Sequence, residues 1–249
     1  MILRAIRKLY VNSSRVYLEQ FCKRAGEATA DGAMLLDAGC GEAPYRKFFG
    51  HTKYESADFC QVDKPYFNQL TYVCSLDEIP VEDERFDTVV MTQVLEHIPK
   101  PRDVLAEISR VMKPGGQLWI SAPLAYPEHE VPYDFFRYTQ FAWKMLCEEA
   151  DLEIEELEWL EGYAGTLAFQ FDYAARHMPW RPESRVVSWF AAPVLYLTRI
   201  WLTILAAYFS RMDLKTKITS KGHCKNYALV LRKKQIEQSD GDANEAVPS

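Results

Sequence analysis

Short runs of branched apolar residues alternate with longer stretches of helical periodicity between residues 33 and 162. The strand-like runs lie at residues 34–37, 54–58, 71–74, 88–92 and 117–122, and two later ones lie at residues 152–160 and 227–231. Continuous apolar strands that alternate with helices are typical of a parallel sheet covered on both faces. The pattern therefore predicts an α/β fold with a doubly wound, mostly parallel sheet of seven strands.

The helices of this pattern have recognisable ends. Residues 101–112 place apolar side chains at helical spacing, and the basic residue and breakers at 113–116 end that helix. Thr139 is the predicted N-cap of a helix at 140–150. The chain is 48% apolar and 26% charged, a composition that excludes wholesale disorder and a polytopic membrane protein.

The chain divides into a core and its additions. We expect an amphipathic N-terminal helical segment (1–32), a ligand-binding core (33–162), an apolar, basic-flanked helical insertion (163–222), the final core strand (223–234) and a disordered tail (235–249). Six cysteines without a C-x-x-C pair argue against a disulfide framework or a zinc ribbon and for a reducing compartment. The start of the sequence lacks the uninterrupted apolar stretch of a cleavable signal.

A glycine loop follows the first strand. The strand ends at Asp37 and continues as Ala-Gly-Cys-Gly through Gly41, so the backbone can approach a ligand at the carboxyl edge of the sheet. Pro44 occupies the third glycine position of a dinucleotide fingerprint, and no P-loop motif occurs. Asp58 ends the second strand 21 positions after Asp37, the spacing at which a carboxylate accepts ribose hydroxyls. These features predict a ligand that contains adenosine without phosphates.

Four segments carry a resemblance to a known family. They are residues 35–41 (LLDAGCG), 86–90 (FDTVV), 94–97 (VLEH) and 110–116 (RVMKPGG). In sequence, order and spacing they resemble the class I S-adenosylmethionine-dependent methyltransferases, in particular the methyltransferase domain of the ubiquinone and menaquinone biosynthesis type. The resemblance covers roughly residues 33–162 and the final strand, and implies a Rossmann-like fold with S-adenosyl-L-methionine as the cofactor.

The resemblance also implies the cofactor-binding residues. These are Asp37, Gly39, Gly41, Asp58, Phe59, Ser75, Leu76 and Gln93. In the family the glycine loop lies against the methionine portion, the acid after the second strand holds the ribose, and the next apolar residue packs on adenine. Ser75 stands where the family commonly has an aspartate, so Asp77 is an alternative contact for the adenine amino group. This departure leaves open a non-catalytic nucleoside-binding or scaffolding protein with the same fold.

The candidate catalytic residues are histidines. Methyl transfer from a sulfonium depends mainly on positioning, and an oxygen acceptor additionally needs a base within hydrogen-bond reach. His129 is the first candidate, because it lies in a loop at 123–138 that leaves the same sheet edge and is dense in aromatic and charged residues. His97 is the second, and the alternatives are an exposed loop histidine and a histidine that only orders its loop. No cluster with metal-ligand spacing is apparent, so no metal is predicted.

Residues 186–209 contain a single charge, Arg199, and are long enough to span a bilayer. A single crossing would separate the final strand from the rest of the sheet. Pro193 is expected to break or kink the segment, and Tyr196, Arg199 and Thr203 share one helical face. We therefore expect a surface-lying or re-entrant helix. The alternative is a helical subdomain packed on the core or in a homodimer.

Charge is distributed unevenly along the chain. The net charge of -6 combines +5 in residues 1–24, -17 in residues 25–175, +10 in residues 176–234 and -4 in residues 235–249. Basic and apolar flanks suit an anionic membrane surface, whereas they are too apolar for a groove that tracks nucleic acid. We expect a cytoplasmic protein, peripheral on the inner face of the membrane, that methylates an oxygen of a lipid or lipid-linked glycan. Residues 134–139 also resemble a methyltransferase subset associated with bacterial surface-polysaccharide biosynthesis.

Overall fold

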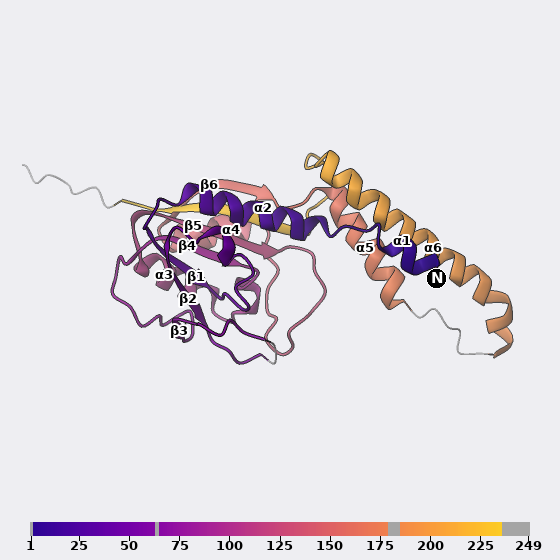
Figure 1. Ribbon diagram of the computed structural model, residues 1–249, viewed down its shortest axis with the longest axis horizontal. Helices are drawn as coiled ribbons and strands as arrows, with labels where there is room; N and C mark the ends of the chain where they lie inside the picture. Colours follow the sequence, from indigo (N-terminus) through magenta and orange to yellow (C-terminus); the bar gives the residue numbers. More distant parts are fainter. Residues whose placement is uncertain (1, 63–64, 179–184, 236–249) are drawn as a thin grey trace, which may run out of the picture.

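A computed structural model describes residues 2–62, 65–178 and 185–235, with the backbone alone for residue 2 and residues 185–190. Its centre is a seven-stranded sheet of order β3-β2-β1-β4-β5-β7-β6 (Figure 1). The strands are β1 (Met34–Ala38), β2 (Lys53–Asp58), β3 (Tyr72–Val73), β4 (Phe86–Thr92), β5 (Met112–Pro123), β6 (Leu152–Trp159) and β7 (Asn226–Lys233). All pairs among β1 to β5 are parallel, and β7 runs antiparallel to both of its neighbours. The predicted Rossmann-like fold with a mostly parallel sheet is confirmed.

Helices cover both faces of this sheet because neighbouring strand residues point to opposite sides. Leu35 and Val90 pack in one buried cluster with α2 (Ser13–Ala28). Leu36 and Val89 pack in the other with α3 (Pro101–Val111) and α4 (Gln140–Glu149). The hydroxyl of Thr139 accepts a hydrogen bond from the backbone N–H of Ala142, so the predicted N-cap of α4 is confirmed. Two short 3-10 helices, η1 (Arg46–Phe48) and η2 (Leu95–His97), follow β1 and β4.

A helical hairpin separates β6 from β7. It consists of α5 (Tyr163–His177) and α6 (Arg185–Lys215), and the short α1 (Ile2–Arg7) lies beside it. The hairpin extends away from the sheet and returns to it, so that β7 completes the sheet between β5 and β6 (Figure 1). The apolar insertion before the last strand is thus present, whereas the predicted disordered tail from residue 236 onward falls outside the described residues.

The expected break at Pro193 is wrong. Helix α6 continues through this residue over its 31 positions. A proline removes one backbone donor and clashes with one carbonyl, and the remaining hydrogen bonds of so long a helix keep it continuous. Among the described residues, one helical segment, Ala191–Lys215, is long and apolar enough to cross a membrane.

Helix α6 exposes an apolar stripe. Its members recur three and four residues apart and are Val194, Leu197, Trp201, Ile204 and Tyr208. Each is between 36% and 62% exposed. On the polar face expected from the sequence, Thr203 is buried, and the guanidinium Nε of Arg199 donates to the carbonyl of Ala175 on α5 at 2.8 Å. Thr203 and Arg199 therefore turn into the hairpin, whereas Tyr196 of the same face is 48% exposed and the apolar stripe lies on the surface.

Candidate functional site

Two adjoining cavities lie where the carboxyl ends of β1, β2, β4 and β5 meet, the usual ligand position in an open α/β sheet. The first has a volume of about 560 Å³ and is lined by residues from the ends of β2, β3 and β4, including Asp58, Ser75 and His97. The second, of about 450 Å³, is lined by Asp37, the glycine loop and the loop after β5. Gly39 and Gln93 line both, so a ligand in one cavity can reach a ligand in the other.

Asp58 is buried at the boundary of the glycine loop. One carboxylate oxygen accepts a hydrogen bond from the backbone N–H of Gly41 at 2.9 Å, and the other accepts one from Cys60 at 3.1 Å. A carboxylate offers about four acceptor positions, so two remain for further donors. This arrangement fits the ribose hydroxyls predicted for Asp58.

The glycines are required by the backbone and by close packing. Gly39 and Gly41 have φ angles of +73° and +53°, a region that disfavours other residues. A Cβ on Gly39 would lie 2.5 Å from a methyl group of Val94, and one on Gly41 would meet nothing within 4 Å. The loop thus offers bare backbone beside open space, as a cofactor pressed against it requires.

Asp37 lies beneath the loop and is 6% exposed. Burial raises the pKa of Asp37 to about 6, although the hydroxyl of Tyr54 donates to its carboxylate at 2.6 Å and so favours the charged form. The neighbouring charge of Asp58 adds to the increase. Asp37 is therefore a carboxylate that is costly to ionise and is suited to a cationic ligand group.

The other predicted cofactor residues lie together. Phe59, Ser75, Leu76 and Gln93 all line the first cavity with Asp58. The ring of Phe59 meets the ring of Tyr133 edge to face, with centroids 5.6 Å apart. Ser75 and the alternative Asp77 line the same cavity. The structure thus brings the implied residues to one place, and their contacts with a cofactor remain predictions.

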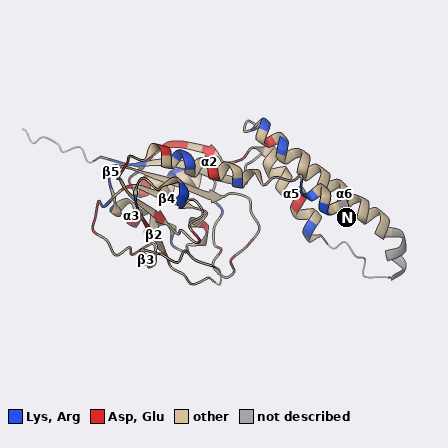
Figure 2. Cartoon of the chain, in the orientation of Figure 1, with Lys and Arg blue, Asp and Glu red and all other residues tan. Residues whose placement is uncertain are grey.

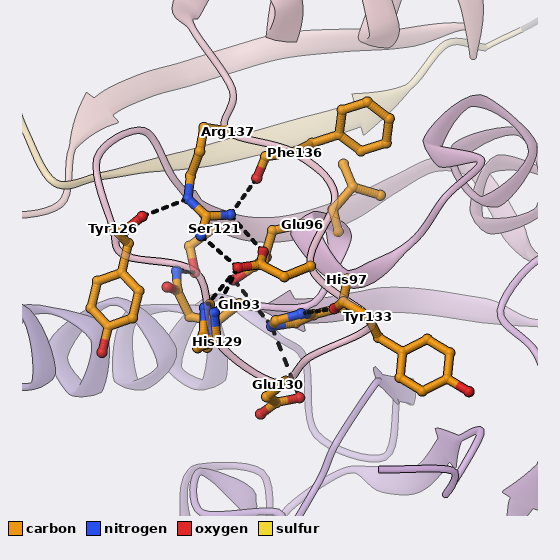
Figure 3. Close-up of polar contacts among 12 residues, drawn as sticks. Gln93, Glu96, His97, Ser121, Tyr126, His129, Glu130, Tyr133, Phe136 and Arg137 are labelled. Carbon is orange, nitrogen blue, oxygen red and sulfur yellow. Dashed lines mark hydrogen bonds and ion pairs between the residues drawn. The ribbon is translucent and has the colours of Figure 1, made fainter.

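The two candidate histidines are in contact (Figure 3). The His97 ring, at the end of η2, and the His129 ring, in the loop after β5, have centroids 4.6 Å apart. Nδ1 of His97 lies 2.5 Å from the carbonyl of Tyr133 and donates a hydrogen bond to it, whereas Nε2 faces carboxylate oxygens of Glu96 and Glu130 at 3.9 and 4.0 Å. Nδ1 of His129 lies 3.3 Å from a carboxylate oxygen of Asp134.

Asp134 anchors the loop that carries His129. The Arg137 guanidinium donates to both of its oxygens, at 2.7 and 2.8 Å, and the backbone N–H of His129 donates at 2.8 Å. These contacts, Arg137 first, hold the pKa of Asp134 well below its usual range. The carboxylate of Asp134 is thus held in place beside Nδ1 of His129.

Comparison with known proteins decides the family. Residues 10–191 match the model of a methyltransferase domain. The chain belongs to this methyltransferase family. The class expected from the sequence, whose methyl donor is S-adenosylmethionine, is therefore confirmed.

Individual relatives are more distant. The ubiquinone biosynthesis O-methyltransferase of Pseudomonas entomophila (strain L48) is 36% identical over 99 residues, which are 38% of this chain and 39% of that protein. The chain thus matches about two fifths of the length of this curated relative. Among solved structures, a geranyl diphosphate methyltransferase has a TM-score of 0.56 at 13% identity, and the [4+2]-cyclase SpnF has 0.54 at 17%. The match covers 87% of this chain in both, with 77% of the first and 81% of the second.

The structure brings together three possible metal ligands, although no metal site was predicted from the sequence. Glu96, His97 and His129 each offer a ligand atom, and these atoms lie within 4.8 Å of one another. These residues have no metal-ligand spacing in the sequence, because η2 and the loop after β5 meet only in the folded chain. Glu96 is 1% exposed, its Oε2 has no hydrogen-bond partner among the described residues, and burial raises its pKa to about 8. Imidazole and carboxylate ligands suit a divalent transition metal.

Two cations of the second cavity were also missed. Arg15, in the first turn of α2, lines the cavity without a carboxylate partner among the described residues, and Lys225, just before β7, is 5% exposed. Neither belongs to a family motif used in the sequence analysis. Only the fold places them beside the glycine loop.

Proposed function

We propose that this methyltransferase transfers a methyl group from S-adenosylmethionine to an oxygen of a lipid or lipid-linked glycan at the membrane surface. The observation that carries the proposal is the junction between the second cavity and the hairpin. Tyr126, in the cavity wall, stacks on Phe169 of α5 with ring centroids 5.2 Å apart. An acceptor that leaves a membrane along the hairpin would therefore arrive beside His129.

Residues of this chain fit the cofactor. Asp58 has two acceptor positions for the ribose, and Phe59 and Leu76 offer apolar surface for the adenine. Arg15 supplies an unpaired guanidinium for the carboxylate of the methionine portion. When bound, the cofactor supplies a methyl group on a sulfonium, a leaving group that needs no acid.

His129 is the proposed base. In the second cavity it would accept the proton of the acceptor hydroxyl, and Asp134 would stabilise the resulting positive charge. His97 would hold the loop in place through the carbonyl of Tyr133. The O-methyltransferase names of the relatives support oxygen as the acceptor atom and a lipid-like acceptor.

The hairpin supports a location on the cytoplasmic face of a membrane. Its apolar stripe (Val194, Leu197, Trp201, Ile204 and Tyr208) ends near exposed Arg211 and Lys215, as a helix in an anionic headgroup layer requires. In Figure 2 helix α6 is largely free of charge along its length and has basic residues near its sheet-proximal end, whereas α5 carries charged residues toward its far end. The basic and aromatic residues 180–189 that also suggested a membrane lie outside the described side chains. A homodimer through the same stripe is the competing arrangement.

Two further possibilities concern the chemical class of the acceptor and whether the protein is catalytic. The resemblance of residues 134–139 to a surface-polysaccharide subset favours a glycan linked to the lipid. Ser75 leaves open a non-catalytic nucleoside-binding or scaffolding protein, and the name of the cyclase SpnF indicates that this fold also serves reactions other than methyl transfer.

Lipid analysis tests the proposal. A strain that lacks this protein should accumulate a lipid or glycolipid lighter by one methylene, detected by untargeted mass spectrometry, and the purified protein should methylate it with isotope-labelled cofactor. Wild-type protein should restore the heavier species and Asp58→Ala should not. Binding of S-adenosylhomocysteine without methylation of any extracted lipid or glycan would contradict the activity and favour the non-catalytic alternative.

A further inference from the structure

Lys225 occupies the junction between the sheet and the loop after β5. Its carbonyl accepts hydrogen bonds from the backbone N–H groups of Leu124 and Ala125, at 2.8 and 3.0 Å. Its side chain lines the second cavity, although only 5% of the residue is exposed. A lysine is almost never buried to this degree without a partner.

The ammonium has no such partner in the described part of the chain. The buried Glu161 lies nearby, but its oxygens accept from the backbone N–H groups of Lys225 and Asn226 and from the Asn226 amide. Nζ of Lys225 lies over the rings of Phe169 and Tyr126 instead, 4.4 and 5.3 Å from their centroids. Aromatic faces attract a cation and leave its three N–H donors unused.

Burial lowers the pKa of Lys225, and the positive charge of Arg15 lowers it further, while Glu161 opposes both. The side chain lines the cavity with no protein acceptor for its ammonium among the described residues, so an incoming anion would supply that acceptor. The site is thus arranged to receive negative charge.

We propose that Lys225 binds an anionic oxygen group of the methyl acceptor in the second cavity. The proposal rests on the proposed function and narrows it to acceptors that carry a phosphate or a carboxylate. Tyr126 and Phe169 would flank the group that carries the charge. The Tyr126 ring also contacts the His129 ring, with centroids 4.9 Å apart, so an anion on Lys225 would place a neighbouring hydroxyl near the proposed base.

The position of Lys225 favours the acceptor over the cofactor. Lys225 directly precedes β7, and its carbonyl binds the first residues after β5, where the loop that carries His129 begins. Its ammonium lies over Phe169 of α5. Arg15 is close enough to Tyr45, which follows the glycine loop, for its charge to act on that phenol. The two cations thus line one cavity from different elements, Arg15 from α2 and Lys225 from the chain before β7, where its side chain lies over Phe169 of α5.

Small aromatic anions test the inference. Phenyl phosphate and benzoate, with neutral benzamide as the reference, are titrated into wild-type protein with and without saturating S-adenosylhomocysteine, and binding is followed by ligand-observed NMR. At least one of the two anions should bind more tightly than benzamide. The anion that binds more tightly indicates whether the acceptor carries a phosphate or a carboxylate. Lys225→Met should weaken that anion about 10- to 100-fold, since a hydrogen bond to a charged group is worth ~1.5–3 kcal/mol. Benzamide should be unaffected.

Two further variants keep the outcome interpretable. Lys225→Arg retains the charge and should retain anion binding, and Lys221→Met makes the same substitution at an exposed lysine and should change nothing. Equal anion binding by Lys225→Met and wild type would overturn the proposal, and so would a loss of S-adenosylhomocysteine affinity in Lys225→Met. If the wild-type protein binds the anion but does not bind S-adenosylhomocysteine, the proposed function is wrong, while Lys225 is still an anion-binding residue.

Discussion

The rings of His97 and His129 meet edge to face with centroids 4.6 Å apart. The first belongs to η2 after β4 and the second to the loop after β5. The carbonyl that accepts from His97 is that of Tyr133, in the same loop as His129. His97 therefore contacts the loop from η2, and His129, within the loop, is the proposed base.

This division of roles predicts different effects of removing each ring. His129→Ala should lower turnover by ~10²–10⁴, the usual loss for a general base. It should leave S-adenosylhomocysteine affinity within about twofold of wild type, because the ring contacts His97, Tyr126 and Asp134 and none of these is a predicted cofactor residue. His97→Ala should disorder the loop and raise KM as well as lower kcat. Steady-state kinetics and calorimetry separate these effects. Near-full activity of His129→Ala with inactive His97→Ala would move the base to η2.

The cluster of one carboxylate and two imidazoles, from Glu96, His97 and His129, predicts binding of a divalent metal. Zn²⁺ should bind one equivalent per chain through Glu96, His97 and His129, measured by competition with a chromophoric chelator. His97→Ala and Glu96→Gln should each weaken binding, whereas His51→Ala, at a histidine outside the cluster, should not. If His129 is the base, added Zn²⁺ should also reduce turnover, and a chelator should restore it. Unchanged zinc affinity in both cluster variants would contradict this site.

Cofactor binding should depend on Asp58. Asp58→Ala removes the acceptor for the ribose hydroxyls, and unpaired buried donors cost ~1–3 kcal/mol, so affinity for S-adenosylhomocysteine should fall roughly 5- to 150-fold. Calorimetry on both proteins measures the change, and Asp103→Ala, at an exposed acid of α3, is the control. Wild-type affinity in Asp58→Ala would refute the ribose assignment, and preference for a nicotinamide dinucleotide would refute the cofactor.

The sequence predicted the sheet well because strand residues carry the signal themselves. Continuous apolar runs predicted the ends of β1, β2 and β4 to within about two residues. Thr139 predicted the start of α4, because its hydroxyl makes the N-cap hydrogen bond. The cofactor side of the site follows for the same reason, since the glycine loop and Asp58 are fixed by the ends of two strands.

The acceptor side could not be predicted because it is assembled by tertiary contacts. Glu96 and His129 have no sequence spacing that marks a ligand set, and Lys225 looks like any basic residue before a strand. The orientation of α6 was equally hidden. Arg199 suggested a polar outer face, yet its bond to the Ala175 carbonyl turns that face toward α5.

Asp37 predicts a specific pH dependence of stability. Its folded pKa of about 6 lies above the unfolded value near 3.8, so the protonated form contributes stability below pH 4 that is lost as pH rises through 6. Asp37→Asn removes this penalty and can still accept from Tyr54, and should raise the free energy of unfolding at pH 8 by up to about 3 kcal/mol without changing it at pH 4. Denaturant titrations at both pH values measure it. An equal change at both would assign the effect to packing.

Membrane binding should depend on both the charge and the apolar stripe of the hairpin. Arg211→Glu with Lys215→Glu should weaken binding to anionic liposomes about 30-fold or more, since each near-surface cation contributes ~1 kcal/mol, and should affect neutral liposomes less. Leu197→Glu with Trp201→Glu should weaken binding to both kinds because these side chains are 56% and 62% exposed. Lys100→Glu with Lys144→Glu is the matched control, because both lysines are exposed on the core.

Salt and topology complete this test. High salt should reduce the electrostatic part, which acts within a Debye length of ~8 Å at physiological ionic strength, and leave the apolar part. Tags at residues 1 and 249 should be digested from the same, cytoplasmic side, because β7 pairs with β5 and β6 after the hairpin returns. Protection of the C-terminal tag alone would demonstrate a true span, which is incompatible with β7 in the sheet. A protein that ignores liposomes and dimerises, with the dimer lost in Leu197→Glu, would assign the stripe to a second copy of the chain.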